Sequence, residues 1–151
     1  MDIEIGISDY RIRSFSNNDI PSLSKHANNP RIAANLRNVF PYPYNSKDAE
    51  KWIEFTQKEI PECNFAIANL TEVIGGIGIE ILHDVYFQVG GVGYWLSEEY
   101  WNHGIMTKAV MAFTEYAFNR YDLIRIFAYV FETNPASARV LEKAGYSFEH
   151  E

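Results

Sequence analysis

The stretch YWNHGIMTKA, residues 100–109, joins a short apolar strand to a long amphipathic helix. Before it, Gly91–Leu96 has the composition of a strand, and after it the apolar residues from Met106 to Tyr121 recur at helical spacing. The next segment, Arg125–Phe131, is apolar on both faces, which is typical of a buried central strand. A strand, a helix and a strand in this order predict a right-handed crossover between two parallel strands.

The segments on either side of this crossover predict a mixed α/β sheet. After it, Asn134-Pro135 starts a helix that Gly145 ends, and Tyr146-Ser147-Phe148 begins a strand. Before it, cap residues, prolines and apolar runs mark further helices and antiparallel strands. These are an extended start at Ile3–Phe15, helices after Asn17-Asn18-Asp19, after Asn29-Pro30 and from Ser46, and strands at Phe65–Ala68 and Val73–Leu82.

Length and charge limit the class of protein. The chain has 151 residues, 47% of them hydrophobic, and its formal net charge is -7. This length predicts a single domain spanning residues 1–151. The negative charge disfavours binding to nucleic acid or to an anionic membrane and mildly favours a basic or amine-bearing partner. An acidic surface that keeps the domain in solution explains the same charge at least as well.

The sequence also indicates the cellular compartment of the protein. No apolar run approaches the roughly 20 residues of a membrane span, and the first residues carry no export signal. The single cysteine, Cys63, cannot form an internal disulfide, which fits a reducing compartment. No basic neighbour in the sequence would lower the pKa of its thiol, so we interpret Cys63 as a small apolar residue. We therefore expect a cytoplasmic protein that has no contact with a membrane.

Gly104 marks the start of the helix in the crossover. The first turn of a helix has backbone amides without intrahelical partners and a partly positive field, so a phosphate is its natural occupant. A residue without Cβ would let the phosphate approach, although turn geometry alone also explains a lone glycine. The chain lacks the phosphate-binding G-x-x-x-x-G-K-[ST] motif and the three-glycine dinucleotide motif.

Three motifs together resemble the GNAT N-acetyltransferase superfamily, and most closely its branch that acetylates the N-termini of ribosomal proteins. They are GYWLS at 93–97, YWNHGIMT at 100–107 and ETNPASARVLEKAGYSF at 132–148. The segment NVFPYPY at 38–44 also resembles the substrate-side loop of that branch. The resemblance covers nearly the whole chain. It implies a mostly antiparallel sheet with one splayed parallel pair, and transfer of acetyl from acetyl-CoA to a primary amine without a metal.

The resemblance also implies which residues bind the cofactor. In the family, the pantetheine arm lies between the splayed strands and pairs with backbone, a role that falls on Tyr94, Trp95 and Leu96. The side chain of Asn134 is implied to reach the pantetheine, and its alternative role is simply to cap its helix. Backbone amides hold the pyrophosphate in the family, and the matching residues are Asn102, His103, Gly104, Ile105, Met106 and Thr107.

The resemblance implies the catalytic residues less completely than the cofactor-binding ones. Ser137 matches a serine that protonates the departing thiolate, and its alternative is an ordinary helix serine. The position at which many relatives carry an acidic tyrosine is Leu141. A base must deprotonate the amine before attack, and Glu80, on the strand beside the expected cleft, is the best candidate. His83 and Glu149 are weaker candidates.

Departures from the family pattern leave other readings open. Only Gly104 matches its loop motif strictly, because Trp101 and Met106 stand at the two ends of that motif. The family has two closing C-terminal strands, and this chain stops inside the first, so we expect those strands to be missing. The alternative functions are a non-catalytic acyl-CoA-binding or regulatory module and an acetyltransferase for small amines such as polyamines or antibiotics. A homodimer also stays open.

Overall fold

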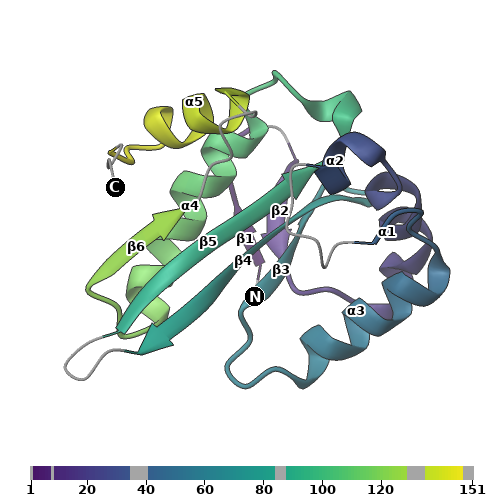
Figure 1. The fold of residues 1–151 in the computed structure, drawn as a ribbon, viewed down its shortest axis with the longest axis horizontal. Coiled ribbons are helices and arrows are strands. Elements are labelled where there is room, and N and C mark those ends of the chain that lie inside the picture. Colours follow the sequence, from purple (N-terminus) through teal and green to yellow (C-terminus); the bar gives the residue numbers. More distant parts are fainter. Residues whose placement is uncertain (1, 8, 35–40, 84–87, 129–134, 148–151) are drawn as a thin grey trace.

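The computed structural model describes residues 2–7, 9–34, 41–83, 88–128 and 135–147. Their central feature is one six-stranded sheet with strands in sequence order, antiparallel from β1 to β5 and parallel between β5 and β6. Figure 1 shows this sheet with helices on both sides. The strands are β1 (Asp2–Glu4), β2 (Arg11–Arg13), β3 (Asn64–Ala68), β4 (Val73–His83), β5 (Gln88–Leu96) and β6 (Arg125–Ala128).

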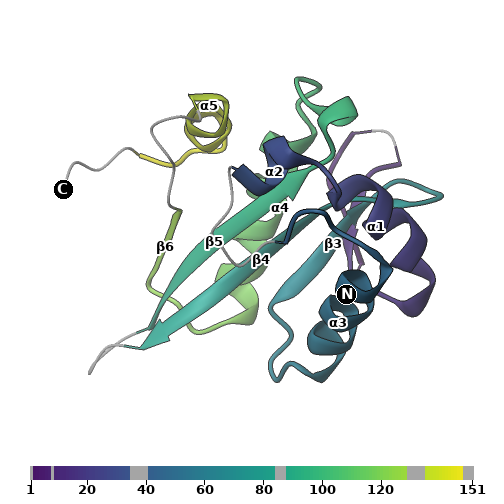
Figure 2. The ribbon, with the colours of Figure 1, turned by 45° about the vertical axis from the view of Figure 1, so that its right-hand side comes forward.

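Helices cover the sheet in two groups. In Figures 1 and 2, α5 lies on the same side of the molecule as β6, whereas α1 and α3 lie on the other side. None of the helices in the described ranges is long and apolar enough to cross a membrane. The helices are η1 (Asn17–Asp19), α1 (Ile20–Ala27), α2 (Pro30–Ala34), α3 (Ser46–Lys58), η2 (Glu98–Tyr100), α4 (Ile105–Arg120) and α5 (Pro135–Lys143).

Two apolar cores lie on the two faces of the sheet. The larger packs α4 against the sheet, and its fully buried rings Phe65 and Phe113 have centroids 5.8 Å apart. The smaller packs α1 and α3 on the opposite face around Leu23 and Ile53, with Trp95 at its border. Burial of this apolar surface is the main force that holds the layers together.

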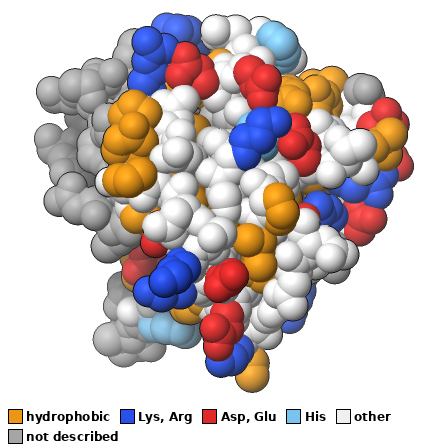
Figure 3. Space-filling view, turned by 90° about the vertical axis from the view of Figure 1, so that its right-hand side faces the viewer, with side chains coloured by type: hydrophobic (Ala, Val, Ile, Leu, Met, Phe, Trp, Pro, Cys, Tyr) orange, Lys and Arg blue, Asp and Glu red, His pale blue; other side chains and the backbone are white. Residues whose placement is uncertain are grey.

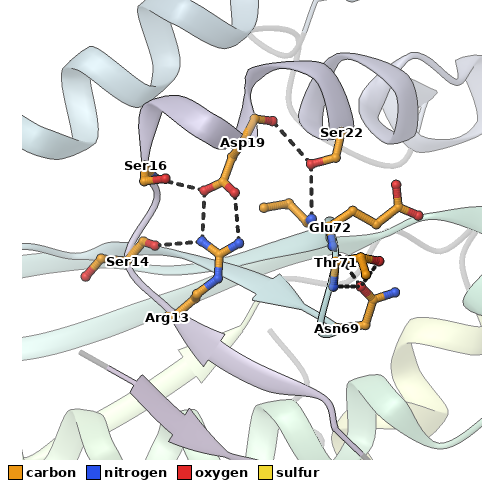
Figure 4. Close-up of polar contacts among 9 residues, drawn as sticks. Arg13, Ser14, Ser16, Asp19, Ser22, Asn69, Thr71 and Glu72 are labelled. Atoms are coloured by element: carbon orange, nitrogen blue, oxygen red, sulfur yellow. Dashed lines mark hydrogen bonds and ion pairs between the residues drawn. The ribbon is translucent and has the colours of Figure 1, made fainter.

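A buried ion pair attaches the start of α1 to the sheet (Figure 4). Arg13 on β2 donates two hydrogen bonds of 2.8 Å to the carboxylate of Asp19, which is only 5% exposed. The backbone N–H of Ser16 donates to the same carboxylate at 2.8 Å. A little further along, the hydroxyl of Ser22 accepts a hydrogen bond from the backbone N–H of Val73 on β4. These contacts fix the position of α1 relative to β2 and β4.

The predicted crossover is confirmed. Strands β5 and β6 are parallel, with α4 between them in the chain, and their register runs from Val89 opposite Arg125 to Val92 opposite Ala128. Beyond Val92, β5 continues to Leu96 while the described part of β6 has ended. Residues 129–134 lie outside the described ranges, so the expected splaying of the pair beyond Val92 stays a prediction.

Strand β6 corrects one expectation. The sequence predicts a buried central strand at Arg125–Phe131, but within the described residues β6 lies at the edge of the sheet next to β5 alone. Arg125 is exposed and the other β6 residues are half-buried, because a single neighbour leaves one side of the strand uncovered. Residues 129–131 of the predicted strand lie outside the described ranges.

The two ends of the chain differ from the prediction as well. Ile3–Phe15 was expected to be one extended segment, whereas the chain turns back within it and pairs β1 with β2 as an antiparallel hairpin. This hairpin buries Ile12 and satisfies backbone groups that a lone strand would leave open. Gly145, at φ +98°, follows α5 as predicted, but Tyr146 and Ser147 are not in a strand, and Phe148 lies outside the described residues.

Candidate active site

The segment after β5 is anchored at two points before it reaches α4. The indole N–H of Trp101 donates a 2.7 Å hydrogen bond to the carbonyl oxygen of Leu96. The buried hydroxyl of Ser97 lies 2.8 Å from Nδ1 of His26 on α1. These contacts tie the segment to the end of β5 and to α1, so the entry to α4 has a defined position.

Gly104 is the N-cap residue of α4 and lies at φ +76°, a conformation that residues with a Cβ rarely adopt. Asn102, two residues earlier, also has a positive φ of 65°. Among the described residues, a Cβ built on Gly104 would meet only the tip of Ile7, at 4.0 Å. The glycine is therefore required by the backbone turn, and the space beside it is open to a ligand.

The first turn of α4 has backbone donors to offer. The first amide of this turn that reaches an intrahelical carbonyl is that of Lys108, which donates to the oxygen of Gly104 at 3.2 Å. Among the described residues no side chain caps this helix. The amides of Ile105, Met106 and Thr107 thus lie at the partly positive end of the helix, where an anion would be stabilised.

One large cavity of about 1850 Å³ connects this helix end with the sheet. It extends along β4 and β5 to α3 on one side and to α5 on the other. Asn134 lies outside the described residues. Apart from Asn134 and Glu149, the residues predicted to bind or react line this cavity, namely Glu80, His83, Tyr94, Trp95, Leu96, Asn102, His103, Gly104, Ile105, Met106, Thr107 and Ser137.

Ser137 lies in the first turn of α5, half-buried, with its hydroxyl oxygen 2.5 Å from the phenolic oxygen of Tyr94. The Tyr94 hydroxyl also donates to the backbone carbonyl of Ser137 at 3.3 Å. Burial raises the pKa of Tyr94, and the hydrogen bond with Ser137 acts in the opposite direction. The family resemblance implied only a backbone role for Tyr94, and the structure adds this contact of its side chain.

Leu141, where many relatives are expected to carry a tyrosine, is 6% exposed and packs in the larger core. The phenol beside Ser137 thus comes from strand β5 instead of helix α5. No local pattern signals this, because the two hydroxyls are 43 residues apart in the sequence.

Glu80 lies on the other face of the sheet from Tyr94. In the continuous β4–β5 register, Glu80 is opposite Gly91 and Tyr94 is opposite Ile77, so the two side chains have opposite parity along their strands. Glu80 is exposed and lines the cavity. His83, at the end of β4, also lines it, and Glu149 lies outside the described residues.

Two basic residues of α5, Arg139 and Lys143, line the same cavity and are exposed. Their spacing of one helical turn puts them on one side of α5, which could have been recognised in the sequence once the helix was expected. They add positive charge to a cavity wall that already contains the N-terminus of α4.

These features together define a class of protein, an acyltransferase-like α/β fold in which a parallel pair, β5 and β6, follows antiparallel strands. Residues 10–147 match the sequence profile of the acetyltransferase (GNAT) domain, and the chain belongs to this family.

Relatives and solved structures agree with this assignment. The chain is 37% identical to the probable N-acetyltransferase YjcK of Bacillus subtilis (strain 168) over 90 residues, which are 58% of this chain and 50% of YjcK. The matched region therefore spans about half the length of that relative.

Two solved structures share the fold. The ribosomal alpha-N-protein acetyltransferase RimL in complex with coenzyme A has a TM-score of 0.83 and 18% identity, covering 99% of this chain and 86% of that one. A spermidine N-acetyltransferase from Vibrio cholerae, in complex with CoA and spermine, has a TM-score of 0.74 and 16% identity, covering 94% and 83%.

Proposed function

We propose that this protein is an acetyl-CoA-dependent N-acetyltransferase that transfers acetyl to a primary amine. The observation that carries the proposal is that the end of β5, Gly93–Leu96, and the start of α4, which has no side-chain cap in the described residues, line the same part of the structure. Both features belong to one cavity that also contains a hydroxyl pair and a carboxylate. Membership of the GNAT family supports the same conclusion.

The residues of the cavity fit the chemistry of acetyl-CoA. The first-turn amides of α4 suit its diphosphate, and the strand backbone of Tyr94, Trp95 and Leu96, which lines the cavity, is proposed to pair with the amides of its pantetheine arm. Arg139 and Lys143 would add charge-assisted contacts to phosphate. Acetyl-CoA itself supplies an activated thioester.

The two faces of the sheet separate the two proton transfers. A thioester bound in the cavity beside β5 would have Ser137 and Tyr94 on one face of the sheet and Glu80 on the other. An amine has a pKa of about 8 to 10.4, so it must lose a proton before attack, and Glu80 is proposed to accept it. Ser137 is proposed to protonate the departing thiolate, and the cavity would hold thioester and amine together.

The acceptor amine is proposed to be a protein N-terminal amino group, by analogy with RimL. The spermidine N-acetyltransferase shares this fold, so a small amine remains the second candidate. We expect the reaction in the cytoplasm, in a single domain spanning residues 1–151. The buried thiol of Cys63 has a pKa raised chiefly by burial, which argues against a covalent acyl-enzyme on that residue.

The proposal is tested by measuring release of free CoA from acetyl-CoA in the presence of defined amines. The panel contains peptides with free N-terminal alanine or serine, the same peptides with blocked N-termini, spermidine and an aminoglycoside. We expect CoA release that depends on one of these amines, with a matching acetylated product in the mass spectrum. Binding of acetyl-CoA without release of CoA from any amine would instead favour the non-catalytic module.

A further inference from the structure

Tyr94 and Ser137 contact each other through their hydroxyl groups. Tyr94 belongs to β5, two residues beyond Val92, where pairing with the described part of β6 ends. Ser137 comes from α5. Their hydroxyl oxygens lie 2.5 Å apart, both residues are half-buried, and both line the cavity.

A phenol and an alcohol at this distance determine each other's orientation. Each hydroxyl has one hydrogen to donate and lone pairs to accept with. The single hydrogen of Tyr94 can go to the Oγ of Ser137 at 2.5 Å or to the backbone carbonyl of Ser137 at 3.3 Å, and the shorter contact favours Oγ. When Tyr94 donates to Oγ, the hydrogen of the serine itself is directed to a different acceptor. A phenol is also a much stronger acid than an alcohol, so its hydrogen bond stabilises a serine oxygen that is losing its proton.

We propose that Tyr94 is a positioning residue that orients the hydroxyl of Ser137 and replaces its proton during release of the thiol. This inference rests on the proposed acetyltransferase function. As the carbon–sulfur bond of the tetrahedral intermediate breaks, the electron pair stays on sulfur, which takes the hydrogen of Ser137. The serine oxygen takes the hydrogen of Tyr94, and the phenolate takes a proton from solvent. Counted from the neutral amine, the nitrogen gives up one proton as it becomes an amide and the sulfur gains one through Ser137, so the protons balance. An amine that starts protonated releases one further proton to solvent through the base.

The same region of the molecule offers a matched control. Tyr146, just after α5, is also a half-buried tyrosine whose hydroxyl lies 2.7 Å from another side-chain hydroxyl, that of Thr114 on α4. Burial raises the pKa of Tyr146 as it does that of Tyr94. Tyr146 does not line the cavity. Removing its hydroxyl therefore tests what a lost tyrosine hydrogen bond does to the fold alone.

The experiment compares Tyr94→Phe, Ser137→Ala, the double variant and Tyr146→Phe, using the amine that the wild-type protein acetylates. We expect Tyr94→Phe to lower kcat roughly tenfold with the KM for acetyl-CoA nearly unchanged, the effect of one lost hydrogen bond to a reacting group. The double variant should be no slower than Ser137→Ala, because Tyr94 acts only through the serine. Tyr146→Phe should lower the Tm slightly and leave kcat unchanged.

Three results would overturn the inference. One is a kcat for Tyr94→Phe equal to that of Tyr146→Phe, which would make the contact structural. Another is a double variant whose fold reduction in kcat equals the product of the reductions in the two single variants, which would make the two residues independent. The third concerns the Ser137→Thr variant, which keeps the hydroxyl and does not depend on how well Ser137→Ala folds. If adding Tyr94→Phe to this variant left its kcat unchanged, the inference would be wrong. A wild-type protein that acetylates no amine would overturn the proposed function together with this inference, whereas the other outcomes leave that function intact.

Discussion

Strand β5 has two different sides. On one side β4 accompanies it along its whole length, from Gln88 opposite His83 to Leu96 opposite Gly75. On the other side the described part of β6 accompanies it only over Val89–Val92. In terms of the described residues, we call the β4 side the closed side and the β6 side the open side. The closed side carries much of the buried core, and the open side carries Tyr94 beside Ser137.

The surfaces differ in the same way. The side of the molecule covered by α1 and α3 shows acidic and basic side chains next to one another, with hydrophobic side chains between them (Figure 3). The cavity wall near α4 and α5 instead combines a helix N-terminus with Arg139 and Lys143. The cavity wall at this end of the molecule is therefore basic, whereas the side covered by α1 and α3 has charges of both signs.

The largest expected effect lies on the closed side. Phe65 is fully buried against Phe113 and Tyr116, so Phe65→Ala should lower the free energy of unfolding by about 3–5 kcal/mol. The matched change on the edge strand, Phe127→Ala, removes a half-buried ring and should cost about 1 kcal/mol. Urea unfolding of both variants measures the difference. Equal losses would show that the open side is as important for stability as the closed one.

Replacing the N-cap glycine should remove cofactor binding. CoA at a hundred times its Kd should stabilise the wild-type protein by about 2.7 kcal/mol, which raises its Tm. The Gly104→Val variant should show no rise in Tm when CoA is added. Gly145→Val is the control, because Gly145 also has a positive φ of 98° with open space around it but does not line the cavity. If Gly104→Val keeps the shift, the phosphate does not bind at this helix end.

Ser137→Ala tests the proposed acid. Its kcat should fall about a hundredfold, the usual contribution of general acid catalysis, while the affinity for acetyl-CoA stays nearly constant. The thiolate forms only as the acetyl group leaves, so its proton matters in the transition state and not in the bound complex. Ser147→Ala, at an exposed serine after α5, provides the comparison. Turnover within about threefold of wild type would remove Ser137 from the mechanism.

The smallest expected effect concerns the base. Glu80→Gln should lower kcat/KM about tenfold at neutral pH, and the deficit should shrink as the pH rises toward the pKa of the amine. The sign follows from the substrate, because more of the amine is already neutral at higher pH and needs no base. Glu115→Gln, on the exposed surface of α4, is the control. A deficit that does not change with pH would indicate that Glu80 only binds the acceptor.

Much of this architecture could be predicted from the sequence because its causes are local. Helical spacing and a glycine entry predicted α4, which begins at Ile105 after an N-cap at Gly104. Gly145 was expected to end α5, and its left-handed φ explains why a glycine stands there. Backbone conformation depends on nearby residues, so short motifs report it well.

The contacts that turn these elements into a candidate site depended on the tertiary structure. The position of β6 at the edge, the hairpin of β1 and β2, and the opposite faces of Glu80 and Tyr94 follow from strand order and register. The pairing of Tyr94 with Ser137 follows from the position of α5 beside the end of β5. The sequence by itself determined which segments are helices and strands, because φ, ψ and periodicity are local. Only the tertiary structure decided which side chains meet, because residues 43 positions apart are brought together by packing of the whole sheet.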